Sequence, residues 1–341
     1  MNLQEMIENS NIMITGGTGS FGHAMTERLL RDFNPNKVVI FSRDEMKQNQ
    51  MASAFNNNSK LRFLLGDIRD LQRLERALDG IDYVFHAAAT KIVPVAEYNP
   101  FECIKTNING AMNLIDASLN KGVKRVIALS TDKACAPINL YGATKLTSDK
   151  LFIAGNLYSG SKDTSFSVVR YGNVLGSRGS VVPFFLSLNE EDHVPITHKD
   201  MTRFMLTLEQ GIDLVLEALH SSTGGEIYIK KIPSMKIIDV ARLICGNKKI
   251  VEVGVRPGEK IHEAMITSED SSFTYEYEDY YKIIPHIILQ YYDIDRFIGS
   301  GQKVEEGFSY SSNNNDDWLS DRIFTEWLEN YIKNPIYSLT I

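Results

Sequence analysis

The first half of the chain alternates short apolar runs with amphipathic stretches. The apolar runs occupy residues 11–15, 37–41, 61–65, 82–88, 125–130 and 166–171. Between them lie segments such as 22–32 and 71–80, in which apolar residues recur at helical spacing. Strands that alternate with helices form βαβ units, whose parallel strands are covered by helices on both faces. The pattern predicts an α/β fold built on a Rossmann-type, doubly wound parallel sheet.

The pattern changes near the middle of the chain. The residues that follow are rich in glycine and lack a helical period, and the remainder mixes short strands with helices. We therefore expect a Rossmann domain over residues 1–172 and a smaller mixed α/β substrate-binding lobe over 173–202 and 226–341. Apolar spacing within 201–220 predicts a helix, so we expect 203–225 to return to the first domain.

Composition and charge narrow the class of protein. The 341 residues carry a net charge of -7, so no broad basic field favours nucleic acid or anionic membrane surfaces. Three cysteines, far apart and without C-x-x-C spacing, argue against a disulfide framework and against a structural zinc. The polar N-terminus is unlike a signal peptide, and no apolar run approaches the roughly 18 residues of a membrane span. We expect a cytoplasmic protein with no membrane, nucleic-acid or metal partner.

A glycine-rich turn follows the first predicted strand and precedes a predicted helix. Its glycines have G-x-x-G-x-x-G spacing. Glycine lets the backbone turn sharply and approach a pyrophosphate, whose charge the helix N-terminus receives. Such strings also occur as ordinary turns, and the position between strand and helix is what favours a dinucleotide. The predicted contacts are Gly16, Thr18, Gly19, Ser20, Phe21 and Gly22.

The end of the second predicted strand bears on which dinucleotide binds. Ser42 and Arg43 stand where NAD-binding folds place an acidic residue against the ribose hydroxyls, and both can donate to a 2′-phosphate. With Asp44 and Lys47 they form the candidate set, and NADP is the predicted cofactor. The alternatives are that Arg43 and Lys47 are solvated surface charges, and that Asp44, which would repel a phosphate, favours NAD.

Further candidate cofactor contacts follow later strands. They are Asp67, Ile68, Ala87, Ala88, Ala89 and Thr106. Asp67 is placed to accept a hydrogen bond from the adenine amino group, or alternatively to cap the following helix. The alanines let the backbone lie close to the cofactor, and Thr106 either contacts it or packs beneath it. His86 is better explained as a hydrogen-bonded histidine at a strand end than as a catalyst.

Two adjacent groups of residues suggest chemistry. Tyr141 and Lys145 are four apart and so lie on one face of a predicted helix, where the ammonium would lower the pKa of the phenol. The spacing alone has little value, because Tyr158 and Lys162 repeat it in a segment rich in glycine and serine.

The strand before the first of these pairs supplies the second group. It ends in Thr131, Asp132 and Lys133, at the carboxyl edge where parallel sheets bind ligands. The alternatives are that Asp132 and Lys133 form a solvated pair and that Thr131 only caps backbone groups.

Several motifs together resemble one superfamily. "TGGTGSFG", "HAAA" and "YGATK" resemble, in order, the cofactor and catalytic motifs of the extended short-chain dehydrogenases/reductases. More narrowly, "STDKACAPINLYGATKL", "RYGNVLGSRGSVVPFF", "MTRF" and "RPGEKIHEAM" resemble the inverting UDP-N-acetylglucosamine 4,6-dehydratases that open pseudaminic acid synthesis. The resemblance runs from about Ile12 to Trp318, and the combination of motifs is highly specific.

The resemblance implies a lyase reaction that leaves the cofactor unchanged overall. Tyr141, helped by Lys145, takes the proton of the sugar 4-hydroxyl while hydride passes from carbon 4 to NADP. Lys133 removes the proton on carbon 5 if burial and the nearby cations Lys145 and nicotinamide keep it neutral. Asp132 protonates the departing 6-hydroxyl, and hydride returns to carbon 6. The implied product is UDP-2-acetamido-2,6-dideoxy-beta-L-arabino-hex-4-ulose, and the nucleotide is expected to stay bound.

The resemblance also implies a site for UDP-N-acetylglucosamine. Its diphosphate requires local cations and bidentate donors, because the acidic surface does not supply them. The candidate substrate contacts are Lys91, Thr131, Tyr141, Asn173, Arg178, Val181, Arg256 and Glu259, and Lys91 is also a cofactor candidate. Kinship further implies a homo-oligomer, either a dimer or a hexamer, that serves flagellin glycosylation.

Two other functions stay open from the sequence. A retaining 4,6-dehydratase or a UDP-sugar 4-epimerase would use Tyr141 and Lys145 without requiring Lys133 as a base. Retaining dehydratases carry an Asp-Glu pair at the place of Asp132 and Lys133. A non-catalytic NADP-binding module would have no need of the complete set of Thr131, Asp132, Lys133, Tyr141 and Lys145.

Overall fold

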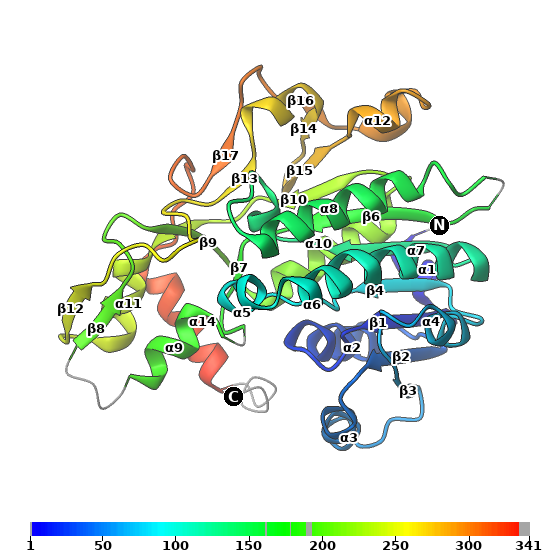
Figure 1. Ribbon diagram of the computed structural model, residues 1–341, viewed down its shortest axis with the longest axis horizontal. Helices are drawn as coiled ribbons and strands as arrows, with labels where there is room; N and C mark the ends of the chain where they lie inside the picture. The colour runs from blue at the N-terminus through cyan, green and yellow to red at the C-terminus, as the bar shows by residue number, and fades with distance from the viewer. Residues whose placement is uncertain (1, 161, 178, 189–192, 334–341) are drawn as a thin grey trace.

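A ten-stranded sheet runs through the molecule in the order β16-β14-β15-β10-β6-β5-β4-β1-β2-β3 (Figure 1). The computed structural model describes residues 2–160, 162–177, 179–188 and 193–333. The parallel strands are β1 (Asn11–Thr15), β2 (Lys37–Ser42), β3 (Leu61–Leu65), β4 (Tyr83–His86), β5 (Arg125–Leu129), β6 (Ser165–Arg170) and β10 (Ile227–Lys230). The antiparallel strands are β14 (Thr274–Glu276), β15 (Tyr280–Ile283) and β16 (Gln302–Lys303). The predicted Rossmann-type parallel sheet is confirmed.

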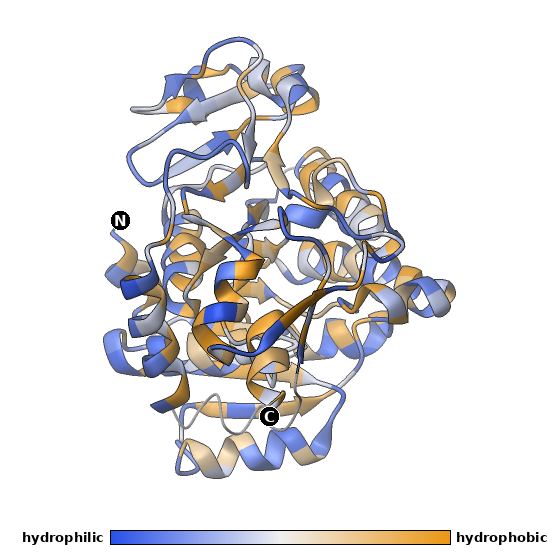
Figure 2. Ribbon diagram, turned by 90° about the vertical axis from the view of Figure 1, so that its left-hand side faces the viewer, coloured by the Kyte–Doolittle hydropathy of each residue, from blue (hydrophilic) through white to orange (hydrophobic). Residues whose placement is uncertain are grey.

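Helices cover both faces of the parallel strands. On one face pack α4 (Leu71–Ala77), α7 (Gly110–Lys121) and α8 (Leu140–Gly155), and on the other α1 (Leu3–Ile7), α2 (Ser20–Asp32) and α10 (Leu208–Ser221). Beside β2 and β3 lies α3 (Glu45–Ala54), and α5 (Val93–Tyr98), α6 (Pro100–Ile104) and the π-helix η1 (Lys105–Asn109) lead from β4 into α7. The helices carry both hydrophilic and hydrophobic residues (Figure 2). Strand residues such as Ile12, Val84 and Ile127 are fully buried, which is why these strands are apolar on both faces.

A smaller lobe has a core of its own. One of its sheets contains β7 (Asn173–Val174), β9 (Thr202–Leu206) and β11 (Ser234–Lys236), and another contains β8 (His193–Ile196) and β12 (Lys249–Glu252). With them lie α9 (Val181–Ser187), α11 (Ile237–Cys245) and α14 (Asp321–Lys333), at the end of the molecule away from β3 and α4 (Figure 1). Phe185, Val240 and Phe324 are buried in this second core. The predicted mixed α/β lobe is therefore present.

The remaining elements are short. They are η2 (Asp132–Ala134), β13 (Ala264–Ile266), η3 (Ser268–Phe273), α12 (His286–Leu289), α13 (Asp295–Ile298) and β17 (Tyr310–Ser311). Because β13 pairs with β17 and contacts η2, it brings a late segment of the chain against the end of β5. None of the helices within the described ranges is long and apolar enough to cross a membrane.

Two expectations about the second half of the chain differ from the structure. The predicted helix over 201–220 divides into β9 and α10, because Thr207 and Gln210 form a capping box that starts the helix at Leu208. The residues after 226 do not all belong to a separate lobe. β10 hydrogen-bonds to β6, and the antiparallel strands extend the sheet beyond it, so that the backbone N–H and C=O groups at the edge of β6 are paired.

Gly22 in α2 gives a test of packing at the glycine-rich turn. A Cβ atom there would lie 2.1 Å from the carbonyl oxygen of Gly17. Alanine favours helix by about 1 kcal/mol over glycine, but forced overpacking typically costs about 1–3 kcal/mol. We therefore expect Gly22→Ala to lower the denaturant midpoint of unfolding.

Gly211 in α10 is the matched control for this substitution. A Cβ atom at Gly211 would meet its nearest neighbour, the Leu206 side chain, at an ordinary 3.6 Å, so Gly211→Ala should leave the midpoint unchanged or raise it. Equal midpoints for Gly22→Ala and the unaltered protein would show that the turn relaxes without cost.

Candidate active site

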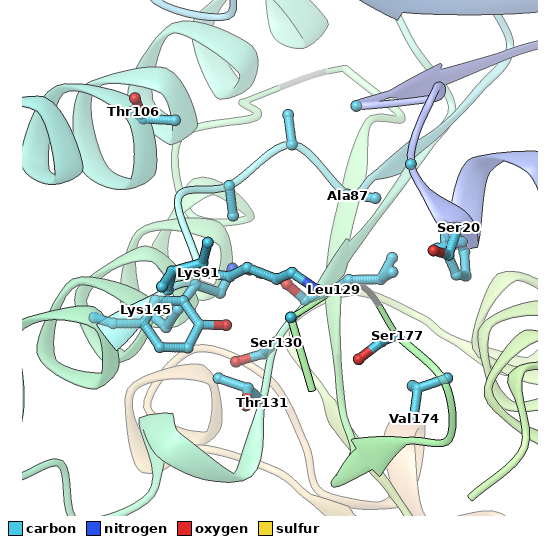
Figure 3. Close-up of a pocket in the computed structure, with 18 of the residues that line it drawn as sticks. Ser20, Ala87, Lys91, Thr106, Leu129, Ser130, Thr131, Lys145, Val174 and Ser177 are labelled. Atoms are coloured by element: carbon cyan, nitrogen blue, oxygen red, sulfur yellow. Dashed lines mark hydrogen bonds between the residues drawn. The ribbon is translucent and has the colours of Figure 1, made fainter. Parts of the chain in front are cut away.

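A cavity of about 1110 Å³ opens at the carboxyl ends of the parallel strands. The sheet order reverses between β1 and β4, and such reversals create the crevice in which doubly wound sheets bind ligands. In Figure 3, Ser20 at the start of α2 lies on one side of the cavity, whereas Lys91 and Lys145 lie together on the other, above Thr131. The volume slightly exceeds the range of about 300–1,000 Å³ that is usual for small-molecule sites. There is room for two ligands side by side.

The glycine-rich turn forms one wall of this cavity. Gly16 has φ of +66°, and a Cβ atom on it would lie 2.8 Å from Cα of Ala88, so only glycine fits there. The turn leads into α2 at Ser20, whose first N–H groups can receive a phosphate. This cradle fits the dinucleotide that the sequence predicts.

Nearly all predicted cofactor contacts line the cavity. They are Gly16, Thr18, Gly19, Ser20, Phe21, Ser42, Arg43, Asp44, Lys47, Asp67, Ile68, Ala87, Ala88, Ala89, Lys91, Thr106, Tyr141 and Lys145. Gly22 is not among them, because it packs against Gly17 inside the turn.

Charged residues lie at the end of the cavity formed by the end of β2 and the start of α3. Asp44 is the N-cap of α3 and accepts a hydrogen bond from the backbone N–H of Lys47. Gln48, which sequence reasoning missed, donates to the hydroxyl of Ser42 at 3.1 Å. Arg43 lies 3.6 Å from Asp67 and has 62% of its side chain exposed, so it can turn toward a bound ligand.

The structure decides between the alternatives for two residues near this end. Asp67 accepts hydrogen bonds from the backbone and guanidinium of Arg69, whereas Asp70 caps α4, so the alternative that Asp67 is the helix cap is wrong. His86 is buried with Nδ1 2.7 Å from the hydroxyl of Thr15. Burial and the neighbouring Lys145 lower the pKa of His86 to about 3, which confirms a hydrogen-bonded histidine at a strand end.

The segment after β5 carries the candidate catalytic groups. Thr131 is the N-cap of η2 and donates to Oδ1 of Asp132 at 2.8 Å. Lys133 donates to the same oxygen at 3.1 Å. Thr131 and Lys133 line the cavity, whereas Asp132 is completely buried behind them. The alternative of a solvated Asp132–Lys133 pair is therefore wrong.

Tyr141 and Lys145 face the same cavity from α8. The Lys145 ammonium donates to the carbonyl oxygen of Leu129 at 2.8 Å (Figure 3). Burial lowers the pKa of Lys145, and the Asp149 carboxylate opposes that shift. The expected lowering of the Tyr141 pKa does not occur in the structure, because burial, reinforced by the Asp132 carboxylate, raises it.

The expected depression of the Lys133 pKa is also wrong for this structure. Burial alone would lower the pKa of Lys133, but the carboxylates of Asp132 and Glu263 outweigh it and hold the pKa above its ordinary value. Glu263 lies 3.7 Å from the Lys133 nitrogen. Sequence reasoning did not single out Glu263, although the motif that contains it was recognised.

The predicted substrate contacts divide into three groups. Lys91, Thr131, Tyr141, Asn173 and Arg256 line the cavity. The side-chain oxygen of Asn173 is buried there and has no hydrogen-bond partner among the described residues, as expected of a group that serves a ligand. Val181, at the start of α9, and Glu259, which accepts from Thr197 at 3.4 Å, do not line it. Arg178 lies outside the described residues.

Comparison with known proteins agrees with this geometry. Residues 12–285 match the family model described as polysaccharide biosynthesis protein. An inverting UDP-N-acetylglucosamine 4,6-dehydratase of Campylobacter jejuni is 56% identical over 93% of this chain and 96% of its own. A UDP-glucose 4-epimerase of Rickettsia prowazekii is 43% identical over 82% of this chain and 84% of its own.

A solved structure extends the agreement to the fold of nearly the whole chain. The X-ray structure of Pen from Bacillus thuringiensis superposes with a TM-score of 0.85 at 36% identity and covers 95% of this chain and 98% of its own. The family match includes both the glycine-rich turn and the Thr131–Lys145 segment. The chain therefore belongs to the polysaccharide biosynthesis protein family, within the extended short-chain dehydrogenases/reductases.

Proposed function

We propose that this protein is an inverting UDP-N-acetylglucosamine 4,6-dehydratase, a lyase that removes water across carbons 5 and 6 of the sugar. The observation that carries the proposal is that Lys133 lines the same cavity as Tyr141 and Lys145. A tyrosine supported by lysine suits proton removal from a hydroxyl, and a further amine suits removal of a proton beside a ketone. The similarity to the Campylobacter jejuni dehydratase supports the same conclusion.

The residues of the site divide the proton transfers among them. Tyr141 in its phenolate form, which the Lys145 ammonium stabilises, takes the proton of the 4-hydroxyl and becomes the phenol. The Lys133 ammonium first passes a proton to Oδ1 of Asp132, 3.1 Å away, and the resulting amine removes the proton on carbon 5. Since Asp132 is buried behind Thr131 and Lys133, a proton from Asp132 reaches the departing 6-hydroxyl through one of those two side chains. The wall formed by Gly16, Ser20 and Ala88 would hold the nicotinamide cofactor, which would supply reversible hydride chemistry with no net redox change. With a proton returned to carbon 5 from the opposite face, the product would be UDP-2-acetamido-2,6-dideoxy-beta-L-arabino-hex-4-ulose.

We infer that the nicotinamide cofactor is NADP. The carboxylate of Asp44 caps α3 and lies 3.3 Å from the ammonium of Lys47, so its negative charge is partly compensated. The guanidinium of Arg43 borders the cavity and is exposed enough to donate to a 2′-phosphate.

A UDP-sugar 4-epimerase is the second candidate, and the identity to the Rickettsia prowazekii protein favours it. Epimerisation needs Tyr141 and Lys145 but no base at Lys133.

Kinship supports a cytoplasmic protein that serves pseudaminic acid synthesis and flagellin glycosylation. For a homo-oligomer, dimer or hexamer, the support is the exposure of Tyr98 and Phe101, at 88% and 76%, since large exposed apolar groups favour protein contacts.

Incubation of the purified protein with UDP-N-acetylglucosamine and no added nucleotide tests the proposal. We expect a product lighter by one water in mass spectrometry, with deuterium at carbon 5 in heavy water and inverted configuration there by NMR. Denaturation of the protein should release NADP. An isomer of unchanged mass would identify an epimerase, and recovery of unaltered substrate would identify a binding module without catalysis.

A further inference from the structure

A second buried carboxylate lies beside the proposed base. Glu263 directly precedes β13, which contacts η2, and it is only 2% exposed. Its Oε1 lies 3.7 Å from the Lys133 nitrogen, and Oδ1 of Asp132 lies 3.1 Å from the same nitrogen. Two carboxylates from distant segments of the chain therefore hold one ammonium. Of the three side chains, only Lys133 lines the cavity.

Glu263 is also surrounded by two further cations. Arg203 lies 3.9 Å from its Oε1, and Lys260 lies 3.8 Å from its Oε2. Yet Oε2 of Glu263 and Oδ2 of Asp132 are buried without a hydrogen-bond partner among the described residues. A cluster that served folding alone would be expected to satisfy these oxygens, because unpaired buried acceptors are destabilising. This incomplete satisfaction points to a role in the chemistry of the site.

We propose that Glu263 is a positioning residue that, together with Asp132, holds the Lys133 nitrogen at the cavity wall and determines how much of it is present as free amine. The inference rests on the proposed role of Lys133 as base. Burial would lower the pKa of Lys133, but Asp132 and Glu263 raise it more, and Arg203 opposes them. Burial and Asp132 raise the pKa of Glu263 itself, against the influence of Lys133, Arg203 and Lys260. In this cluster the negative charge of Glu263 favours the ammonium form of Lys133.

The pH dependence of Lys133 acetylation tests the inference without any substrate. Only the free amine reacts with acetic anhydride, so peptide mass spectrometry of Lys133 across a pH series reports its protonation. Glu263→Gln removes a charge that favours the ammonium, and the midpoint of labelling should move to lower pH by about one unit. Glu263→Asp withdraws the charge by one methylene and should give an intermediate midpoint. If Glu263→Gln or Glu263→Asp folds and its labelling midpoint equals that of the unaltered protein, the inference is overturned.

Glu276→Gln provides the matched control. Glu276 lies on β14, and its Oε1 is 2.7 Å from the Lys231 nitrogen. The variant therefore removes a glutamate charge outside the Lys133 cluster and should leave the labelling midpoint of Lys133 unchanged. An equal shift in Glu276→Gln and Glu263→Gln would also overturn the inference. Because labelling needs no turnover, failure of the unaltered protein to release water would count against the proposed function and leave the labelling result intact.

Discussion

Replacing Tyr141 with phenylalanine should lower the release of water from UDP-N-acetylglucosamine by about 10²–10⁴-fold, the contribution typical of a general acid–base group. Tyr141 lines the cavity and is only 8% exposed, and phenylalanine fills nearly the same volume, so the fold should persist. The phenol oxygen is the atom that takes the proton of the 4-hydroxyl in the proposed reaction. Initial rates of product formation, measured by mass spectrometry at saturating substrate, give the effect on kcat.

The chain contains its own control for this substitution. Tyr158 and Lys162 have the same spacing as Tyr141 and Lys145, but Tyr158 is 71% exposed and does not line the cavity. Tyr158→Phe should therefore retain the native rate. If Tyr141→Phe also retained it, the hydroxyl of Tyr141 would have no part in the reaction, and both the dehydratase and the epimerase would need another base.

The first half of the fold could be predicted because its signals are local. Runs such as 12–14 and 126–129 are apolar without interruption, and the helices between them have clear periodicity. The strands that extend the sheet at its other edge are only two to four residues long, too short to show a period. The start of α10 did have a local signal, the capping box of Thr207 and Gln210, which apolar spacing alone obscured.

In the candidate site, too, the features with local sequence signals could be predicted, and those that depend on distant segments could not. The glycine-rich turn is one continuous stretch of sequence, and so is the Thr131–Lys145 segment. The residue types and spacing within each stretch suffice to predict that the two meet at the strand ends. The electrostatic state of Lys133 could not be predicted, because it depends on Glu263, which pairing of β13 with β17 brings to η2. Burial and nearby cations suggested a neutral amine, whereas the structure adds a carboxylate that reverses the direction of the pKa shift.

Replacing Lys133 with methionine should stop the release of water while leaving oxidation at carbon 4 possible. Methionine keeps an unbranched side chain in the cavity wall but has no amine, so it cannot remove the proton on carbon 5. We expect a loss of about 10²–10⁴-fold in water release. Addition of substrate should still produce the absorbance band of reduced nicotinamide, because Tyr141 and Lys145 are unaltered.

Lys162→Met is the control for the loss of a lysine, since its ammonium donates to the carbonyl oxygen of Leu119 and it does not line the cavity. It should turn over at the native rate. Native rates of water release in Lys133→Met would instead favour a retaining dehydratase, in which another group removes the proton on carbon 5. Loss of both water release and nicotinamide reduction would mean that Lys133 acts before carbon 4 is oxidised. Measuring nicotinamide reduction and water release separately therefore distinguishes two roles for Lys133. A base for carbon 5 is needed only for water release, whereas a lysine that only binds the sugar nucleotide is needed for both steps.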